Sequence, residues 1–337
     1  MGECSTKGWL PIEIFFDEQP AVTPHALVRW MEFGAAPLAE PFFEQTVSNL
    51  RSATPPAREV DTDMDTVVRI SSRLSPVSPA GFIFHVSHCG STLLANVLKT
   101  AGGTTVVSES RPVTSLLRSY GEPPGHYLKD RWSRTQQTLL RSLMALYAHY
   151  RTGEPEQLVL KLTSVDLLSM QVVRACWPDV PCVVVVRDPA EVIVANLRGG
   201  WWLEVKSNPR LAREIFGWEA SSCAPEEMSD EDYCGRILGQ YLTSALAAVD
   251  ETCKVIDYED LNTRRIRDIA EFFQVQLPPD RQKVDGMFGR YSKDPSGQMQ
   301  FRDDRALKRK LATPAVIRAT QQWAMPAYSE LRGKGFW

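Results

Sequence analysis

Short apolar segments alternate with segments of helical periodicity from residue 81 onward, and no other pattern in the sequence restricts the fold as much. Five runs have the length and β-branched content of buried strands: residues 81–86, 104–107, 157–162, 181–187 and 253–258. Between them lie segments with helical spacing: residues 91–102, 131–150, 164–177, 189–198 and 231–250. The run 183–186 is valine throughout, which is typical of a central strand covered on both faces. The sequence therefore predicts an α/β fold with a doubly wound parallel sheet flanked by helices.

The length of 337 residues suits one large sheet domain with additions. We expect residues 1–79 to form an N-terminal extension packed on the main domain, because this segment leads into the proline-rich sequence SRLSPVSPAG. Residues 80–337 then form the main domain, with a helical segment at its C-terminal end. The long connection 199–230, which is rich in tryptophan, is typical of a lid or a ligand-binding insertion.

Net charge and cysteine usage restrict the partners and the environment. The formal net charge of -3 gives no general attraction to nucleic acid or to an acidic membrane surface, so we expect neither as a partner. The first residues lack the pattern of a secretory signal, and no run reaches the roughly 18 apolar residues of a membrane span. The seven cysteines are scattered without a zinc-type pattern. We therefore expect a cytoplasmic protein with reduced, buried thiols and no bound metal.

The main chemical signal is the sequence FHVSHCGSTLLANVL, which spans residues 84–98. An apolar strand leads into a short loop, Ser91 and Thr92 open a helix, and Gly90 permits a ligand to approach the backbone closely. Backbone N–H groups and the positive end of the helix dipole then converge on one point, where an anion can bind. An ordinary helix N-cap by serine or threonine has the same short pattern. The loop alone does not separate these two interpretations.

The loop differs from the Walker A motif GxxxxGK[ST] in two places. Ser91 replaces the lysine that neutralises the transferring phosphates, and His85 replaces the first glycine. An ATP-dependent P-loop phosphotransferase is therefore the second interpretation, in which Asp188 would be the magnesium-binding acid after the valine run.

The loop resembles the 5′-phosphosulfate-binding loop of sulfotransferases that use PAPS (3′-phosphoadenosine 5′-phosphosulfate), especially bacterial relatives that read S-R-x-G-S-T-L-L. Two further segments are similar to family elements: VVVVRDPAEVIVAN, in which Arg187 ends a strand and Pro189 opens a helix, and VIDYEDL. The resemblance covers at least residues 81–273. It implies a P-loop-type domain that moves a sulfuryl group from PAPS to a hydroxyl or amine of a small-molecule or natural-product acceptor and releases PAP. Residues 199–230 would then be a lid or an acceptor-binding insertion.

The resemblance also implies which residues bind the donor. These are Ser87, His88, Cys89, Gly90, Ser91, Thr92, Arg187, Asn196 and Arg302. Arg187 would hold the 3′-phosphate, and a basic segment near the C-terminus would close over it, with Arg302 as its first candidate. Ala195 occupies the position of a phosphate-binding serine in the family, and the amide of Asn196 could compensate for that change.

Catalysis requires stabilisation of the negative charge that builds on the departing oxygen. Lys161 ends a strand where the family has a lysine close to the reaction centre, which implies a catalytic role beside the loop amides. His88 occupies the position of a lysine or arginine in the family, and a histidine near neutral pH is protonated only part of the time. Either a bound anion charges His88, or Lys161 alone stabilises the leaving group.

The general base is a separate question, because a histidine used by one branch of the family is here Thr163. Glu109 lies just beyond the second strand and is our first candidate, and Arg111 would orient it or bind an acidic acceptor. Cys89 lies at the mouth of a helix N-terminus, a setting that lowers the pKa of a thiol. We therefore expect Cys89 to react with alkylating agents unless the donor protects it, although a small residue selected for its fit is the alternative.

A noncatalytic nucleotide-binding relative is the third interpretation. The changes at His88, Thr163 and Ala195 would remove several active-site functions at once, as in a pseudoenzyme. The residues that argue for an enzyme are Gly90, Ser91, Thr92, Lys161 and Arg187.

Overall fold

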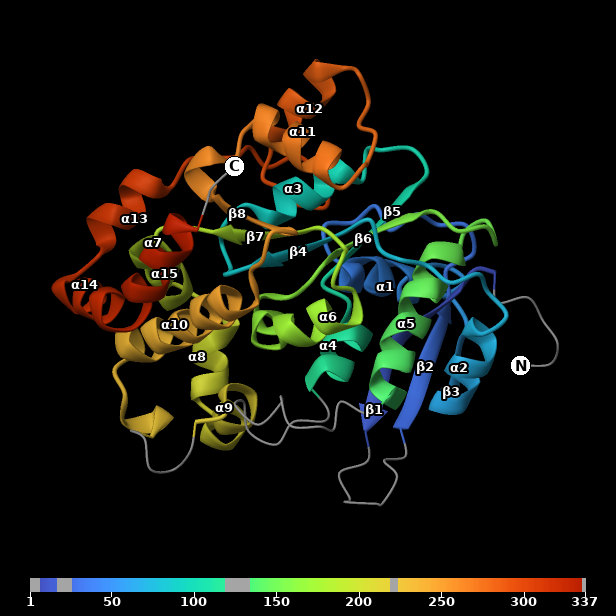
Figure 1. Ribbon diagram of the computed structural model, residues 1–337, viewed down its shortest axis with the longest axis horizontal. Coiled ribbons are helices and arrows are strands. Elements are labelled where there is room, and N and C mark those ends of the chain that lie inside the picture. The colour runs from blue at the N-terminus through green and yellow to red at the C-terminus, as the bar shows by residue number, and fades with distance from the viewer. Residues whose placement is uncertain (1–6, 17–25, 119–133, 219–223, 335–337) are drawn as a thin grey trace.

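The computed structural model describes residues 7–16, 26–118, 134–218 and 224–334 (Figure 1). Its central sheet contains β4 (Gly81–His85), β5 (Thr104–Ser108), β6 (Gln157–Lys161), β7 (Cys182–Val186) and β8 (Cys253–Asp257). The strand order is β5-β6-β4-β7-β8, and all neighbouring strands are parallel. The chain thus places β5 and β6 on one side of β4, and β7 and β8 on the other. The predicted strands and the predicted α/β class are confirmed.

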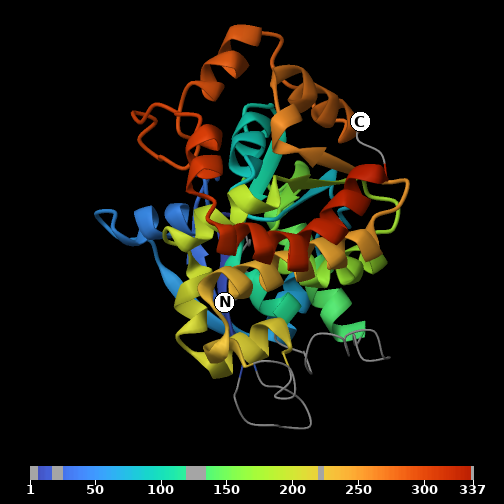
Figure 2. The ribbon, with the colours of Figure 1, turned by 90° about the vertical axis from the view of Figure 1, so that its left-hand side faces the viewer.

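Helices cover both faces of this sheet (Figures 1 and 2). Above it in Figure 1 lie α3 (Ser91–Leu98), α11 (Thr263–Phe272) and α12 (Arg281–Phe288). Below it lie α4 (Arg111–Arg118), α5 (Arg134–His149), α6 (Met170–Cys176) and α10 (Asp230–Ala248). A 3-10 turn, η1 (Ser164–Ser169), precedes α6, and another, η3 (Tyr258–Asp260), follows β8. The predicted helical segments are confirmed, and the part of 131–150 before Arg134 lies outside the described residues.

The central strands form where the sequence has no polar side to expose. Every residue of β4, β5 and β7 is buried, as is required of strands covered by helices on both faces. Polar side chains then fix where helices begin. Asp188 accepts a hydrogen bond from the N–H of Glu191 at the start of α7 (Pro189–Leu197), and Ser229 accepts one from Asp232 at the start of α10. Asp188, the magnesium ligand of the phosphotransferase interpretation, is therefore a helix cap in this structure.

The N-terminal residues form a separate antiparallel sheet of β1 (Trp9–Phe16), β2 (Ala26–Glu32) and β3 (Glu59–Asp63), with α1 (Phe43–Arg51) and α2 (Met64–Ser71). This sheet contacts the main sheet's helices, because β1 packs against α4 and α5, and α2 packs against α5. Trp30 is completely buried between them. The segment before α1 also places Phe42 beside the main sheet, which matters for the site described below.

Helices α8 (Trp201–Lys206) and α9 (Pro209–Phe216) occupy most of the described part of the long connection, and η2 (Pro225–Glu227) follows. Trp202 and Trp218 are buried, and Phe216 stacks on Trp218 with ring centroids 5.2 Å apart. These two tryptophans therefore belong to the hydrophobic core.

The C-terminal helices lie on the face turned to the viewer in Figure 2, where α13 packs against α7 and the later helices pack across α10. They are α13 (Arg305–Leu311), α14 (Pro314–Ala319), the π-helical turn η4 (Thr320–Ala324) and α15 (Met325–Gly333). Gly235 and Gly239 of α10 permit the close approach of η4. A Cβ atom on Gly239 would lie 2.2 Å from the carbonyl oxygen of Trp323.

The cysteines correct one expectation. Cys182 and Cys253 form a disulfide, whereas the sequence predicted reduced thiols throughout. The reason is the register of β7 and β8, which pairs the first residues of the two strands and brings their Cα atoms to 4.7 Å. Cys176 and Cys234 are free and buried, as expected, and Cys89 is also free and buried. Cys4 and Cys223 lie outside the described residues. In the described part of the chain no helix has the length and apolar character to cross a membrane.

Candidate functional site

Most backbone N–H groups of the loop after β4 have no backbone acceptor. Ser87, His88 and Gly90 have φ angles of 83°, 49° and 81°, so the loop passes repeatedly through the left-handed region. Within the described chain no backbone hydrogen bond is donated by the N–H groups of residues 88–93, and the first one comes from Leu94 to Gly90. Successive free N–H groups at the start of a helix form an anion-binding concavity. The predicted succession of strand, loop and helix is confirmed.

Gly90 is required by space as well as by its φ angle. A Cβ atom there would lie 2.7 Å from Leu261 and 3.0 Å from the ring of Tyr258. A side chain at this position would have to displace the side chains of Leu261 and Tyr258, in addition to the strain of its positive φ angle.

A cavity of about 400 Å³ lies beside the loop, at the carboxyl ends of the central strands. This is the point where the strand order reverses around β4, the usual ligand position in doubly wound sheets. The loop residues Ser87, His88, Cys89, Gly90, Ser91 and Thr92 all line the cavity. Arg187 and Tyr258 lie at one end of it and His85 and Glu109 at the other, and each end has its own polar network.

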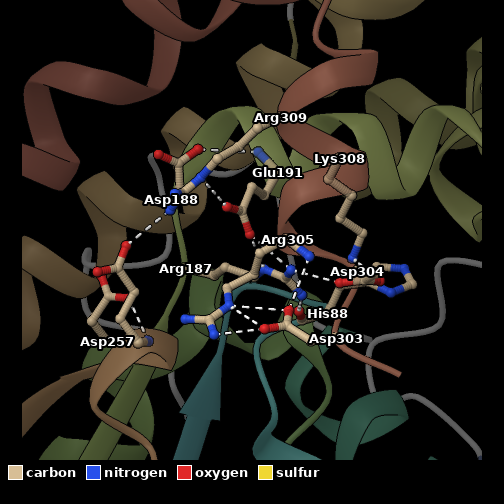
Figure 3. A network of polar contacts seen from close by, with 11 residues as sticks. His88, Arg187, Asp188, Glu191, Asp257, Asp303, Asp304, Arg305, Lys308 and Arg309 are labelled. Atoms are coloured by element: carbon tan, nitrogen blue, oxygen red, sulfur yellow. Dashed lines mark hydrogen bonds and ion pairs between the residues drawn. The ribbon is translucent and has the colours of Figure 1, made fainter. Parts of the chain in front are cut away.

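Arg187 is the centre of the first network (Figure 3). Its guanidinium donates to Glu191 Oε2, to the carbonyl oxygen of His88 and to Asp304 Oδ1, each at 2.8 Å. It also stacks over the ring of Tyr258, 4.3 Å from the centroid. Because the Arg187 side chain is only 4% exposed, these partners fix it at the cavity wall beside the loop.

Asp304 connects this network to the C-terminal segment. Lys308 Nζ lies 2.8 Å from Asp304 Oδ2, so one carboxylate bridges Lys308 and Arg187. Arg309 reaches Glu191 at 2.8 Å, which fastens α13 to α7. The expected basic segment therefore lies over the cavity, but Arg302, our first candidate in it, is exposed and does not line the cavity.

The second network joins three side chains at the carboxyl ends of β4, β5 and β6. Lys161 is fully buried and donates a hydrogen bond to Glu109 Oε1. His85 Nδ1 accepts a hydrogen bond of 3.2 Å from the N–H of Ser87, so a neutral His85 has its proton on Nε2. That Nε2 lies 3.4 Å from Glu109 Oε1. Glu109 and His85 line the cavity, whereas Lys161 lies behind Glu109 and does not.

Burial and neighbouring charges fix the protonation of these groups. Burial, and then the charge of Lys161, lowers the pKa of His85 to about 4. Burial, and then the charge of Lys293, lowers the pKa of His88 to about 3. Burial alone would raise the pKa of Glu109, but Lys161 and His85 outweigh it and hold that pKa well below its usual range. At neutral pH both histidines are therefore uncharged and Glu109 is a carboxylate.

Two expectations about individual residues are wrong. Burial raises the pKa of the Cys89 thiol, whereas its place before a helix predicted a lowered pKa. The side chain is only 1% exposed, so the thiol is a packing group and the predicted reactivity is lost. Arg111 does not contact Glu109, because it pairs with Glu13 at 3.2 Å and Glu44 at 3.6 Å on the N-terminal sheet and α1.

Asn196 lines the cavity as the sequence suggested. Its amide nitrogen donates to the carbonyl oxygen of Val192 at 2.9 Å. Its Oδ1 atom is buried and has no hydrogen-bond partner in the described chain. A buried polar atom without a partner at a cavity wall is suited to binding a ligand.

Lys308 lines the cavity as part of the basic segment that the sequence indicated. Several other lining residues were missed by the sequence reasoning: Phe42, His85, Tyr258, Lys293 and Asp304. His85 and Tyr258 end strands at the active edge of the sheet, and that position could have identified them. The others come from segments far from the loop in sequence, and no local pattern marks them.

Comparison with known proteins gives distant structural neighbours only. No protein-family model matches the sequence, and no curated protein matches it. One similar solved structure is a sulfotransferase domain from the curacin biosynthetic pathway, with 16% identity, a TM-score of 0.40 and coverage of 74% of this chain and 98% of that chain. Another is a sulfotransferase from Alicyclobacillus acidocaldarius, with 15% identity, a TM-score of 0.38 and coverage of 76% and 99%. At such distance the function has to be argued from the residues of the cavity.

Proposed function

We propose that this protein is a sulfotransferase that moves a sulfuryl group from PAPS to a hydroxyl or amine of a small-molecule acceptor and releases PAP. The observation that supports this most directly is the loop of residues 87–92, which lines a cavity at the end of β4 and whose N–H groups from residue 88 on make no backbone hydrogen bond. The loop has the form of a phosphate-binding loop but contains Ser91 in place of the lysine that phosphoryl transfer uses.

The two ends of the cavity suit a donor with two anionic groups. The loop amides and the hydroxyls of Ser91 and Thr92 would bind the 5′-phosphosulfate. Arg187 would bind the 3′-phosphate, since its fork of donors matches phosphate geometry and the phosphate could take the place of Asp304 at Nη2, which Glu191 also contacts. Asn196, with its free amide oxygen, would contact the nucleotide between these groups.

The acceptor would react at the end occupied by Glu109. Its oxygen or nitrogen forms a bond to sulfur while the bond from sulfur to the bridging phosphate oxygen breaks and leaves its electron pair on that oxygen. The acceptor's proton passes to Glu109, whose Oε1 is held by Lys161. Because the pKa of Glu109 is low, this carboxylate orients the acceptor and takes the proton only as the new bond forms. Lys161 then acts through Glu109 as a positioning residue.

Calorimetric titration with PAP tests the donor site. We expect micromolar binding of PAP, no comparable response to ATP with magnesium, and a loss of about 10- to 100-fold in affinity for Arg187→Ala, the size of one or two charged hydrogen bonds. Arg210→Ala is the matched control, because Arg210 is exposed on α9 and away from the cavity.

The outcome separates the three interpretations. Absence of PAP binding to a folded wild-type protein would contradict the proposal, and binding of ATP with magnesium in its place would favour the phosphotransferase. Tight PAP binding without transfer of ³⁵S label to a broad acceptor panel would favour the noncatalytic relative. Circular dichroism of Arg187→Ala is needed beside the titration, because this variant leaves Glu191 buried with Arg309 as its remaining cation.

A further inference from the structure

We propose that Lys293 supplies the positive charge that the loop of residues 87–92 lacks, by binding the oxygens of the donor's 5′-phosphosulfate from the opposite wall of the cavity. This inference rests on the proposed function and adds a binding residue to it. No motif in the sequence marks Lys293, which lies about two hundred residues after the loop.

Lys293 lies on a segment that is firmly held. Tyr291 N donates to Met299 O at 2.8 Å, and the carboxylate of Asp294 accepts from the N–H groups of Ser296 and Met299. The segment is fastened to α3 by a hydrogen bond of 2.8 Å from Asn96 to the carbonyl oxygen of Ser292. Because α3 begins at the anion-binding loop, this bond fixes Lys293 relative to the loop.

The ammonium group of Lys293 has no partner of its own. Among the described residues no hydrogen bond or ion pair engages it, and its neighbour Asp294 is occupied by backbone N–H groups. Arg187, Arg305 and Lys308 line the same cavity, and each of them pairs with a carboxylate. Arg290 lines it as well, but from an exposed position. A half-buried ammonium without a counter-ion costs free energy, which an anionic ligand would recover.

The surroundings of Lys293 place it at the loop end of the cavity. After burial, its charge is the largest contribution to the lowered pKa of His88, and Glu109 is the largest charge acting on Lys293 itself. Lys308, by contrast, interacts mainly with Asp304 and Arg187. Lys293 thus lies toward the loop, whereas Lys308, whose charge is the next to act on His88, pairs with Asp304 at the proposed 3′-phosphate end.

The chemistry explains why this charge is needed. Sulfuryl transfer leaves an electron pair on the bridging phosphate oxygen, and a cation beside that oxygen lowers the barrier. The loop offers no cation, because Ser91 replaces the Walker lysine and His88 is neutral at the pH of the cell. Lys161 is engaged with Glu109 and does not reach the cavity. Lys293 is the lining ammonium that remains free for this role.

Two nucleotides distinguish this role from a general effect of charge. PAP has both phosphates, whereas adenosine 3′-phosphate lacks the 5′-phosphate that Lys293 would bind. We expect Lys293→Met to lower the affinity for PAP about 10- to 100-fold in calorimetric titrations, which is the effect of losing one hydrogen bond to a charged group. The affinity for adenosine 3′-phosphate should be unchanged. Lys293→Arg keeps the charge and should stay within a few-fold of the wild type.

Lys310→Met is the matched control, since it removes the same charge from an exposed position on α13 that does not line the cavity. It should leave both affinities unchanged. An undiminished affinity of Lys293→Met for PAP, or an equal loss for both nucleotides, would overturn the role of Lys293 and leave the sulfotransferase proposal intact. Failure of the wild type to bind PAP would overturn both. If Lys293→Met unfolds, Lys293→Gln replaces it, with the same expected results.

Discussion

His85 and His88 connect the charge state of the cavity to the stability of the fold. Their folded-state pKa values of about 4 and about 3 lie below the ordinary histidine value of 6.5. Between these values the unfolded chain binds more protons than the folded chain. The contribution of these two histidines to the free energy of unfolding is therefore fully present above pH 6.5. It is lost as the pH falls from 6.5 toward the folded-state pKa values.

We expect the free energy of unfolding to decrease as the pH is lowered from 7 to 5, with each histidine contributing up to about 1.4 kcal/mol per pH unit. His88→Asn removes one of the two titrating groups and should make this pH dependence shallower. Denaturant unfolding of both proteins at several pH values measures the difference. An identical pH dependence would show that the pKa of His88 is the same in the folded and the unfolded chain.

Contiguity in sequence decided which site residues could be predicted. The loop was predicted because Gly90 and Ser91 lie in one motif between a strand and a helix. Arg187 was predicted because the contiguous segment VVVVRDPAEVIVAN resembles a family element. Lys293 and Phe42 reach the same cavity only through tertiary packing. For Cys89 the sequence position was misleading, because its place before a helix suggested a reactive thiol and burial removes that reactivity.

At the scale of elements, α13 and the residues before it place a carboxylate where the donor's 3′-phosphate is proposed to bind. Asp304 occupies both Arg187 and Lys308. A phosphate that binds there has to displace this carboxylate, so part of the binding free energy is spent on breaking two ion pairs.

Asp304→Asn should therefore bind PAP several-fold more tightly than the wild type in calorimetric titrations, because a neutral amide competes less with phosphate for the two cations. Asp303→Asn is the control of equal charge, since Asp303 pairs with Arg305 instead. If Asp304→Asn binds PAP more weakly, Asp304 instead serves to position Arg187 for the ligand.

The central strands could be predicted because their burial requires continuous apolar sequence, whereas the N-terminal sheet could not. β3 reads EVDTD and is mostly exposed, so it has no apolar pattern. It forms because β2 provides backbone hydrogen-bond partners for it, and because Arg29 of β2 pairs with Asp61 of β3 at 2.9 Å. Such a strand depends on its partner, and its own residues do not specify it.

At the scale of the whole molecule, the C-terminal helices are joined to the sheet domain through the glycines of α10. Gly239→Ala should destabilise the protein by about 1–3 kcal/mol, because the new methyl group meets the backbone of Trp323. Gly286→Ala on α12 is the control, since a Cβ atom there meets nothing within 4 Å, and it should be neutral or stabilising by up to about 1 kcal/mol. Thermal and denaturant unfolding of the two variants measure both effects. Equal stabilities would mean that η4 moves aside without cost.

The cavity has walls from distant parts of the chain: Phe42 precedes the sheet domain, the loop and Arg187 lie within it, and Lys293 and Asp304 follow its last strand. During synthesis on the ribosome, all five central strands are therefore made before the wall that holds Lys293. A nascent chain can complete its sheet while its nucleotide site is still open on one side. The nascent chain would then bind the donor only after residues up to Lys308 have been synthesised. A chain truncated after β8 would have the loop but not the complete cavity around it.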